Sequence, residues 1–298
     1  MTKVAVDVEG TQVMLSNLDK VLYPAEGFTK GQVLDYYSRI APVLLPHLAG
    51  RALTRKRYPD GVDGQVFFEK NAPRGTPDWV RTERLASPGS TKGRETIDYV
   101  IVDGLPALVW TANLASLELH THMWRVDTAA AEPTQCPPDL IVFDLDPGAP
   151  ATIVECCEVA CRLRPLLEAD GLTPVAKTSG SKGLQLYARA DGFGSSEQTS
   201  AYAKGFAQRL EKEHPELVVH RMTKSLRPGK VLVDWSQNSA AKTTVSVYSL
   251  RARQRPTVST PVSWAEVENC RAADDLVFTS DDVLARVEQH GDLFAPLL

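Results

Sequence analysis

The chain passes through Asp139-Leu-Ile-Val-Phe-Asp144-Leu-Asp146-Pro-Gly148, and this stretch decides the fold. An apolar run that ends at a Pro-Gly turn predicts a buried β-strand over 140–146. Side chains alternate across a strand, so Asp144 and Asp146 point the same way from its end. Two carboxylates about 4 Å apart repel by roughly 1 kcal/mol in water and roughly 4 kcal/mol near a protein surface. We therefore expect a cation between them, and oxygen ligands favour Mg²⁺ or Mn²⁺.

The elements that follow this strand come in an informative order. Capping patterns open helices at Thr152 and at Ser195, and short apolar runs predict strands between and after them. The order is β-α-β-β-α-β with one added strand, over residues 140–146, 152–168, 173–178, 184–188, 195 onward, 217–222 and 231–235. This is the split βαβ or ferredoxin-like arrangement of polymerase palms and RNA-recognition modules. It puts Asp144 and Asp146 on a central strand and Asp234 on the added strand.

The N-terminal part contains one clear helix. Thr29 and Gln32 form a capping pattern ahead of apolar residues at helical spacing. Pro42 is expected to kink or end this helix. Apolar runs over 97–102 and 105–110 predict two short strands.

The whole chain is expected to form one α+β module over residues 1–298. Two packed lobes are predicted: about 1–130 for nucleic-acid contacts, and 131–298 with an RRM-like or palm-type catalytic core. The Ala/Pro-rich stretch 128–138 is the best boundary between them. Five cysteines without a Cys-x-x-Cys pair argue against a zinc site. No apolar run approaches the roughly 20 residues of a membrane span, so we expect a cytoplasmic, nucleoid-associated protein without a membrane partner.

The net charge of −4 does not point to a nucleic-acid partner, but the charge distribution does. Residues 221–255 carry a net charge of +7 with Asp234 as the single acid, whereas residues 262–298 carry −6. A solvated basic face would not need that aspartate, but a phosphate-binding groove with a metal ligand would. Taken singly, each basic residue of the segment is an ordinary surface residue. Candidates for bidentate phosphate contacts are Arg227, Lys230, Arg251, Arg253 and Arg255.

Three aspartates, Asp144, Asp146 and Asp234, form the expected catalytic centre. With two bound ions, one would lower the pKa of an attacking hydroxyl and the other would neutralise a triphosphate and its leaving group. An isolated Asp-x-Asp at a strand end can instead simply cap a turn. The basic surroundings of Asp234 and the predicted palm favour the metal site over that alternative.

Three further groups of residues carry possible chemistry. The loop Thr178-Ser179-Gly180-Ser181-Lys182-Gly183 lacks Walker spacing, but its glycines, hydroxyls and lysine favour a phosphate cradle over a merely flexible hairpin. An exposed Phe67 or Phe68 among basic residues would stack on a base, and core packing is the alternative. His120 and His122 share one face if they lie on a strand. One of them is expected to bond a phosphate or a metal-bound aspartate, and a buried structural histidine is the alternative.

Together these residues resemble the polymerase domain of bacterial ligase D, within the archaeo-eukaryotic primase superfamily. Nearly the whole chain takes part, and so many ordered matches are far more specific than any one motif. The matching segments are Leu18-Asp19-Lys20-Val21-Leu22-Tyr23-Pro24, Arg57-Tyr58-Pro59-Asp60-Gly61, Phe67-Phe68, Glu118-Leu119-His120, Phe143-Asp144-Leu145-Asp146-Pro147-Gly148, Thr178-Ser179-Gly180-Ser181-Lys182-Gly183, Thr223-Lys224-Ser225-Leu226-Arg227, Val233-Asp234-Trp235-Ser236-Gln237-Asn238 and Tyr248-Ser249-Leu250-Arg251.

The resemblance implies a template-directed nucleotidyltransferase that fills gaps or extends DNA ends in non-homologous end joining or gap repair. It also implies two Mn²⁺ or Mg²⁺ ions, a preference for ribonucleotides, and a Ku protein and a DNA ligase as partners. The metal ligands would be Asp144, Asp146 and Asp234. The nucleoside-triphosphate contacts would be Phe67, His120, Ser179, Gly180, Lys182, Gln185, Arg227, Gln237 and Arg251. The DNA contacts would be Lys56 and Phe68, with Lys20 and Lys30 as the pair that grips a 5′-phosphate.

Two features depart from the family pattern. The family loop continues to a histidine where this chain has Gln185, which donates a hydrogen bond but does not titrate near neutral pH. No ligase or nuclease module follows, so we expect either a stand-alone relative or an excised domain.

Two other classes fit parts of the pattern. A haloacid-dehalogenase-type phosphatase also places Asp-x-Asp at a strand end, but it needs a parallel sheet. A non-catalytic RNA-recognition module would expose aromatic residues on its central strands, where this chain has carboxylates.

Overall fold

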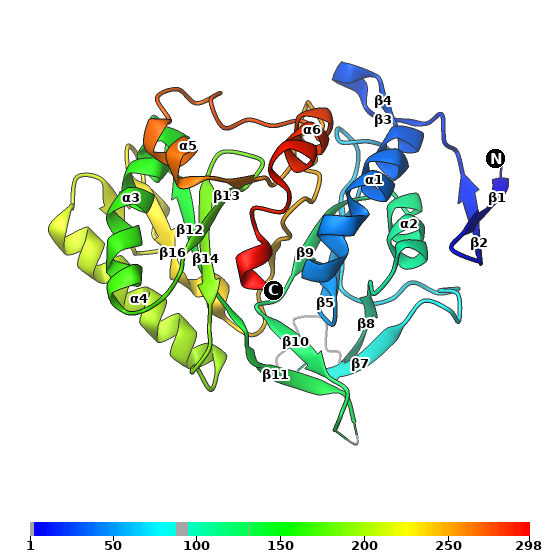
Figure 1. The fold of residues 1–298 in the computed structure, drawn as a ribbon, viewed down its shortest axis with the longest axis horizontal. Helices are drawn as coiled ribbons and strands as arrows, with labels where there is room; N and C mark the ends of the chain where they lie inside the picture. The colour runs from blue at the N-terminus through cyan, green and yellow to red at the C-terminus, as the bar shows by residue number, and fades with distance from the viewer. Residues whose placement is uncertain (1–2, 88–94, 131) are drawn as a thin grey trace.

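The computed structural model describes residues 3–87, 95–130 and 132–298. The fold is mixed α+β and contains two six-stranded sheets that lie side by side (Figure 1). One hydrophobic cluster lies between the first sheet and its helices, and a larger one underlies the second sheet and extends across the junction. Among the described helices, none combines the length and the apolar character that a bilayer span requires.

The first sheet has the strand order β15-β16-β12-β14-β13-β18. Both neighbours of β12 run antiparallel to it, so the parallel sheet of a dehalogenase-type phosphatase is not formed here. Two helices, α3 (Ile153–Ala169) and α4 (Ser196–Glu213), pack against this sheet. Its strands are β12 (Leu140–Pro147), β13 (Val175–Thr178), β14 (Leu184–Arg189), β15 (Val218–Val219), β16 (Val231–Asp234) and β18 (Pro261–Val262).

The pleat of β12 decides where its aspartates point. Ile141, Phe143 and Leu145 are fully buried in the cluster that contains α3 and α4. Since alternate residues face opposite sides of a strand, Asp144 and Asp146 face away from these helices. The apolar residues that precede them on that face belong to the larger cluster beneath the second sheet. Asp144 and Asp146 therefore point in the same direction, as expected, and this direction is toward the side on which the two sheets meet.

The second sheet has the order β17-β9-β5-β8-β7, with β6 also paired to β5. Its strands are β5 (Ala52–Arg57), β6 (Phe67–Glu69), β7 (Thr82–Ala86), β8 (Thr96–Ile101), β9 (Ser116–Thr121) and β17 (Thr244–Val245). The helices beside it are α1 (Lys30–Leu48) and α2 (Leu105–Asn113), and α5 (Trp264–Asn269) and α6 (Ser280–His290) follow near the C-terminus. In the described part of the chain there are also three two-stranded ribbons: β1 (Lys3–Val8) with β2 (Thr11–Ser16), β3 (Val21–Tyr23) with β4 (Phe28–Thr29), and β10 (Trp124–Asp127) with β11 (Thr134–Pro138).

The N-terminal half departs from expectation at one segment, and at a second place the structure decides between two expected outcomes. The segment 105–110, expected as a strand, begins helix α2, which has Gly104 as its N-cap and Pro106 in its first turn. A short run that is apolar on every side does not distinguish a buried strand from a buried helix, and the proline was the better signal. Helix α1 has the capping box expected at Thr29, but it continues through Pro42 to Leu48. Its apolar face is almost fully buried, and that burial outweighs the roughly 3 kcal/mol that an interior proline costs.

The strands at the far edge of the first sheet also differ from expectation. Only Val218 and Val219 of the segment 217–222 form a strand, and they pair with β16 at the sheet edge. The added strand, β16, takes the central place beside β12 instead. All four residues of β16 are buried, whereas the end of the other segment turns polar at His220 and Arg221. The more apolar run therefore enters the middle of the sheet.

An ion-pair network joins the two sheets. Arg51, next to β5, donates two hydrogen bonds of 2.8 Å to the carboxylate of Asp139, at the start of β12. Arg125 of β10 donates to the same carboxylate at 2.8 Å and to the carbonyl of Ala49 at 2.7 Å. Asp139 therefore neutralises two arginines that would otherwise lie together at the junction. The stretch 128–138, expected as a boundary, contributes β11 to the ribbon here, and residue 131 lies outside the described residues.

Replacing Asp139 by alanine should lower the free energy of unfolding by about 3–5 kcal/mol, because it leaves the buried guanidinium of Arg51 without a counter-charge. Equilibrium denaturation with urea measures this change. The matched control is Asp191→Ala, which removes an exposed partner of Arg189 and should change stability by less than about 1 kcal/mol. Equal effects of the two substitutions would contradict a joining role for Asp139.

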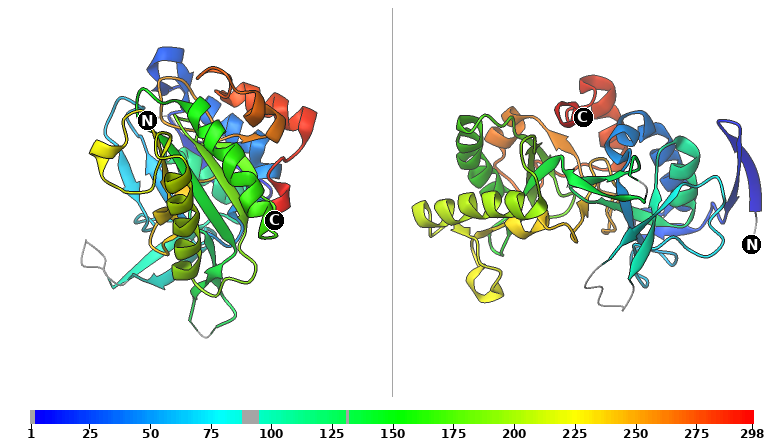
Figure 2. Two further views of the ribbon diagram at one scale, coloured as in Figure 1. Left: turned by 90° about the vertical axis from the view of Figure 1, so that its left-hand side faces the viewer. Right: turned by 90° about the horizontal axis from the view of Figure 1, so that it is seen from below.

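The C-terminal segment crosses the same junction. Figure 2 shows the segment after α6, in red, lying over the region where the two sheets meet. The ring of Phe294 packs 5.4 Å from that of His47 on α1 and 5.4 Å from that of Tyr187 on β14. The segment therefore fixes the two sheets relative to each other, which matters because the site described next draws residues from both.

Candidate active site

Pairing between β12 and β16 brings the three aspartates together. Asp144 lies directly opposite Asp234, and residues directly opposite in an antiparallel pair project from the same face. One carboxylate oxygen from each of Asp144, Asp146 and Asp234 lies within 4.8 Å of the others. Asp144 and Asp234 are almost buried, and Asp146 is exposed. The three residues thus converge from strands that are about 90 positions apart in the sequence.

The electrostatics of the three carboxylates favour a bound cation. Burial, and then the charge of Asp146, raise the pKa of Asp144 to about 7. Burial and the charge of Asp234 also raise the pKa of Asp146. A carboxyl group with a raised pKa is less stable in its charged form. A divalent cation would relieve this repulsion, and a set of three carboxylate oxygens suits Mg²⁺ or Mn²⁺. The donor set therefore fits the metal that the sequence predicted.

Neighbouring side chains hold two of the carboxylates. Gln185 of β14 donates to Asp144 Oδ1 at 2.9 Å. The backbone N–H of Ser236 and the side chain of Gln237 donate to Asp234 at 3.0 and 2.9 Å. Gln185 and Gln237, both expected beside the triphosphate, line the same cavity, and their amides contact Asp144 and Asp234.

The loop between β13 and β14 forms one wall of this cavity. Ser179 Oγ accepts hydrogen bonds from the backbone N–H groups of Ser181 and Gly183, so the loop closes on itself. Gly180 has a φ of +65°, and a Cβ there would lie 2.6 Å from the backbone of Val258. Only glycine allows this approach, which lets the segment after Arg251 support the loop. The loop is therefore ordered by neighbours on both sides, as a phosphate cradle requires.

Cationic side chains line the opposite walls of the cavity. Its volume is about 510 Å³, and it is lined by Asp144 and Asp146, by the loop and by residues of the second sheet, with Asp234 next to these two aspartates. Arg251 donates to the carbonyl of Ser179 at 2.5 Å. Arg227 reaches the cavity because Gly148 lies against its backbone, where a Cβ would be 2.1 Å from the Arg227 carbonyl oxygen. The predicted site residues that line the cavity are His120, Asp144, Asp146, Ser179, Lys182, Gln185, Arg227, Gln237 and Arg251.

Glu118 is a residue that the sequence analysis did not select. Its carboxylate, only 1% exposed, accepts from Lys56 Nζ at 2.9 Å and lies 3.3 Å from Arg251 Nε. It also bonds His120 Nε2 at 2.9 Å and accepts from the backbone N–H of Ala252 at 3.1 Å. Burial acts to raise the pKa of Glu118, but these partners hold it well below its usual value. The sequence signal was the spacing of two between Glu118 and His120 on one strand face.

The two histidines have separate surroundings. His120 lies on β9 and lines the cavity, whereas His122 lies beyond the end of that strand. The ring of His122 stacks on Trp124 with centroids 4.3 Å apart and is buried. Burial lowers its pKa to about 3, so it stays neutral. His122 is therefore a buried structural histidine, which was the alternative to a phosphate or aspartate contact.

The two phenylalanines of β6 are both exposed, by 37% for Phe67 and 51% for Phe68. Phe68 pairs with Lys56 and Phe67 with Arg57, so they occupy opposite faces. The ring of Phe68 lies 6.4 Å from that of His120. Of the two, Phe68 is therefore on the side of the cavity, although neither lines it.

The lysines expected at a 5′-phosphate lie apart from the aspartates, beside the ribbon β1–β2. Lys20 Nζ pairs with Asp60 at 2.8 Å and is exposed. Lys30 is 5% exposed and donates to the carbonyl of Ser16 at 2.5 Å. Burial, and then the charges of Lys20 and Arg57, lower the pKa of Lys30 to about 8.

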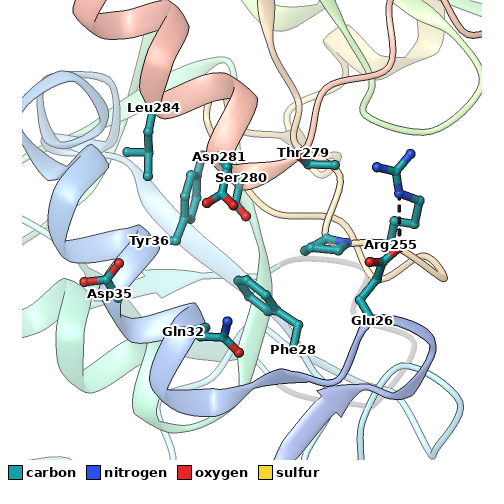
Figure 3. Close-up of a pocket in the computed structure, with 11 residues that line it drawn as sticks. Glu26, Phe28, Gln32, Asp35, Tyr36, Arg255, Thr279, Ser280, Asp281 and Leu284 are labelled. Carbon is teal, nitrogen blue, oxygen red and sulfur yellow. Dashed lines mark ion pairs between the residues drawn. The ribbon is translucent and has the colours of Figure 1, made fainter.

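The basic segment 221–255 divides between different surroundings. Arg227, Arg251 and Arg253 line the cavity, but Lys230 donates to a backbone carbonyl elsewhere. Arg255 Nε lies 3.2 Å from Glu26 at a second cavity, of about 350 Å³, between α1 and the start of α6 (Figure 3). Apart from Arg255 itself, none of the residues predicted to bind nucleotide or DNA lines that second cavity. The charge count alone therefore selected more basic residues than line the cavity beside the aspartates.

Comparisons with known proteins give one consistent result. A family model described as the primase-polymerase domain of LigD matches residues 29–294. The chain is 45% identical over 286 residues to the multifunctional non-homologous end joining protein LigD of Mycolicibacterium smegmatis, covering 96% of this chain and 36% of that protein. It is 29% identical over 282 residues to the bifunctional non-homologous end joining protein LigD of Bacillus subtilis, covering 94% and 43%. The chain thus spans well under half the length of these relatives.

A solved structure extends the likeness to three dimensions. The polymerase domain of Mycobacterium tuberculosis ligase D, in complex with DNA, superposes with a TM-score of 0.89 at 45% identity. The match covers 96% of this chain and 97% of that one. Sequence and fold therefore agree over nearly the full length of the described structure.

Proposed function

Because the chain belongs to the LigD primase-polymerase family, and is thus a nucleotidyltransferase, we propose that it fills gaps or extends ends of DNA by template-directed, two-metal synthesis. Non-homologous end joining or gap repair is the proposed setting, and ribonucleotides are the preferred substrates. The observation that carries the proposal is the convergence of Asp144, Asp146 and Asp234 beside a cavity lined by cationic side chains. A metal-dependent transfer to a triphosphate needs both parts in one place.

The aspartates would hold two Mg²⁺ or Mn²⁺ ions, which lower the pKa of an attacking 3′-hydroxyl and neutralise the triphosphate when bound. Asp144 and Asp234 are fixed by their hydrogen bonds with Gln185, Ser236 and Gln237. Among the described residues none donates such a bond to Asp146, which is the most exposed of the three. It is therefore the carboxylate best able to adjust when substrate arrives.

The cationic residues and the glycine loop would hold the triphosphate. Lys182, Arg227 and Arg251 supply charge, and His120 donates a hydrogen bond. Ser179 and Gly180 shape the loop that lies against the phosphates. We propose that Phe67 and Phe68 stack on bases, with Phe68 on the cavity side, and that Lys56 contacts DNA beside it.

In structural terms, we propose a single module with two lobes, about 1–130 and 131–298. The order β16-β12-β14-β13 with α3 and α4 supports an RRM-like, palm-type core in the second lobe. The 5′-phosphate of a gap would bind in the first lobe at Lys20 and Lys30. A Ku protein and a DNA ligase are proposed partners, since the matching relatives are non-homologous end joining proteins. We propose a cytoplasmic location beside the nucleoid.

Primer extension tests this function. The substrate is a gapped DNA with a 5′-phosphate on the downstream strand, supplied with Mn²⁺ and either ribo- or deoxyribonucleoside triphosphates. We expect addition that follows the template base, favours ribonucleotides and stops when a chelator is added. Extension that ignores the template, or that proceeds equally well in chelator, would refute the proposal. Release of phosphate from a small monoester would instead support a phosphatase.

Replacing both Lys20 and Lys30 by alanine should remove the preference for 5′-phosphorylated gaps and leave extension on an open template nearly unchanged. Binding of phosphorylated and unphosphorylated gapped DNA, compared by fluorescence anisotropy, measures that preference. An equal loss of binding to phosphorylated and to unphosphorylated gapped DNA would contradict a specific phosphate contact.

The pH dependence of the unsubstituted protein gives a second readout of the same contact. Because the pKa of Lys30 is lowered to about 8, its ammonium is charged below that pH and loses its charge above it. A phosphate monoester has a second pKa of about 6, so it stays doubly charged over this range. The preference should therefore be full near pH 7 and decline between about pH 8 and 9.5. A preference that rises with pH would exclude Lys30.

A further inference from the structure

A row of four side chains crosses the first sheet on the face that carries the aspartates. Strand register places Lys177 of β13 opposite Gln185 of β14, Gln185 opposite Asp144 of β12, and Asp144 opposite Asp234 of β16. Directly opposed residues have Cβ atoms about 5 Å apart, so neighbours in the row are in contact. The row therefore leads from a buried ammonium to the two most buried carboxylates of the metal site.

Lys177 is 1% exposed, which is unusual for a lysine. Its Nζ donates to Gln185 Oε1 at 2.5 Å and to Ser259 Oγ at 2.7 Å. It also lies 5.4 Å from the centre of the Tyr187 ring. Burial holds the pKa of Lys177 well below its usual value, and the charge of Asp144 acts in the opposite direction and favours the ammonium form. Within the described structure Lys177 makes no ion pair with an acidic side chain, so the ammonium form depends on the nearby charge of Asp144.

The lysine decides which way the Gln185 amide points. An ammonium group has donors only, so the atom of Gln185 that faces it must be the carbonyl oxygen. The hydroxyl of Tyr187 donates to that same Gln185 oxygen at 3.4 Å. The amide nitrogen is then left facing Asp144, where it donates at 2.9 Å to Oδ1. If the Gln185 amide were rotated by 180°, its N–H groups would face the N–H groups of the Lys177 ammonium. Its oxygen would then face the carboxylate of Asp144.

We propose that Lys177 and Gln185 form a positioning relay, in which the buried ammonium locks the Gln185 amide so that it fixes the Asp144 carboxylate for divalent-cation binding. The relay rests on the proposed function, since it acts on the aspartates assigned there as metal ligands. It explains how this chain has glutamine where the family pattern has histidine. A neutral amide with its donor and acceptor held apart gives Asp144 one fixed hydrogen bond at any pH. One oxygen of Asp144 stays free of that bond.

Gln185→Met tests the relay, because methionine keeps the length of the side chain and removes both polar atoms. Mn²⁺ binding to the nucleotide-free protein is measured by the electron paramagnetic resonance signal of free Mn²⁺. We expect affinity to fall roughly 10- to 100-fold, as for other residues that orient a metal ligand. Lys177→Met should lower affinity by a similar factor. The double variant should be no worse than the stronger single one, because both act through one hydrogen-bonded row.

Controls separate positioning from folding. Gln208→Met makes the same chemical change at an exposed position of α4 and should leave Mn²⁺ binding unchanged. Thermal unfolding of each variant in chelator reports folding alone. If Lys177→Met does not fold, the comparison of Gln185→Met with Gln208→Met decides the matter. Mn²⁺ affinity of Gln185→Met within threefold of the unsubstituted protein would overturn the relay.

A last variant distinguishes the failure of this inference from the failure of the proposed function. Asp144→Asn should abolish Mn²⁺ binding whether or not the relay exists. If Asp144→Asn loses Mn²⁺ binding and Gln185→Met does not, the metal site stands and the relay is wrong. If neither substitution changes Mn²⁺ binding, the aspartates are not metal ligands and both proposals are wrong.

Discussion

Replacing Asp144 by asparagine should lower the rate of nucleotide incorporation by about 10³-fold or more, since metal ions contribute several kcal/mol and each 1.36 kcal/mol is a factor of ten. Asparagine has nearly the same shape, so the loss reports the missing carboxylate. Single-turnover primer extension, with both proteins at the same Mn²⁺ concentration that saturates the unsubstituted protein, measures the rate.

The same substitution should raise the stability of the metal-free protein. The pKa of Asp144 in the folded state, about 7, lies above its unfolded value of about 3.8. A carboxyl group of this kind contributes stability that is full below about pH 4 and is lost as the pH rises through about 7. At pH 8 in chelator, the unsubstituted protein carries that penalty and the asparagine variant does not. Thermal unfolding should therefore show a higher midpoint for the variant, by a few degrees.

Added Mn²⁺ should reverse this order. A ligand that binds only the folded state raises the unfolding midpoint, so the unsubstituted protein gains stability with Mn²⁺ concentration and the variant does not. A variant that is less stable than the parent in chelator, or that is stabilised equally by Mn²⁺, would contradict the electrostatic description of the site. The unsubstituted protein in Ca²⁺-free, chelator-treated buffer is the reference for each comparison.

Glu118→Gln should have the second largest effect, on both stability and substrate affinity. Glu118 is the buried counter-charge for Lys56 and Arg251 and the hydrogen-bond partner of His120. Removing its charge leaves cations close together with no acid between them, which lowers the free energy of unfolding by about 3–5 kcal/mol. Because the pKa of Glu118 is held well below its usual value, this contribution is present above about pH 4 and persists into acid.

Substrate affinity should fall with stability, because the three partners no longer share one fixed acceptor. We expect the KM for the incoming nucleotide to rise about tenfold, as for loss of one charged hydrogen bond. Steady-state primer extension under conditions where the variant is folded measures KM. Glu213→Gln, which weakens an exposed pair with Arg209 on α4, is the control and should change neither quantity. An unchanged KM in Glu118→Gln would leave Glu118 with a purely structural role.

Local signals predicted the helices well where capping residues were present. The capping boxes at Thr29 and Thr152 and the cap at Ser195 all form, because they depend only on residues within one turn. The failures fell where local preference and tertiary burial compete. Pro42 is tolerated because the face of α1 is buried, and the segment 105–110 is a helix because it packs beside α1 and not within a sheet.

The candidate site divides in the same way. The direction of Asp144 and Asp146 follows from the pleat of a single strand, and their pairing with Asp234 was inferred from its charge surroundings. The structure brings these three together, with the loop residues beside them. Charge counting also selected Arg255, which pairs with Glu26 elsewhere. Glu118 was overlooked because its spacing of two from His120 does not show that Lys56 and Arg251, from other segments, also contact it.

By itself, the sequence determined the strand that carries the paired carboxylates, the turn that ends it, and the order of elements around it. These features repeat over two to four residues and are therefore visible locally. Only the tertiary structure decided that β16 lies next to β12, that Lys177 reaches Asp144 through Gln185, and that Glu118 serves three partners. These contacts depend on strand register and on burial between distant segments. Which strands pair decides the partner of a buried charge, and the neighbours of that charge in the chain do not.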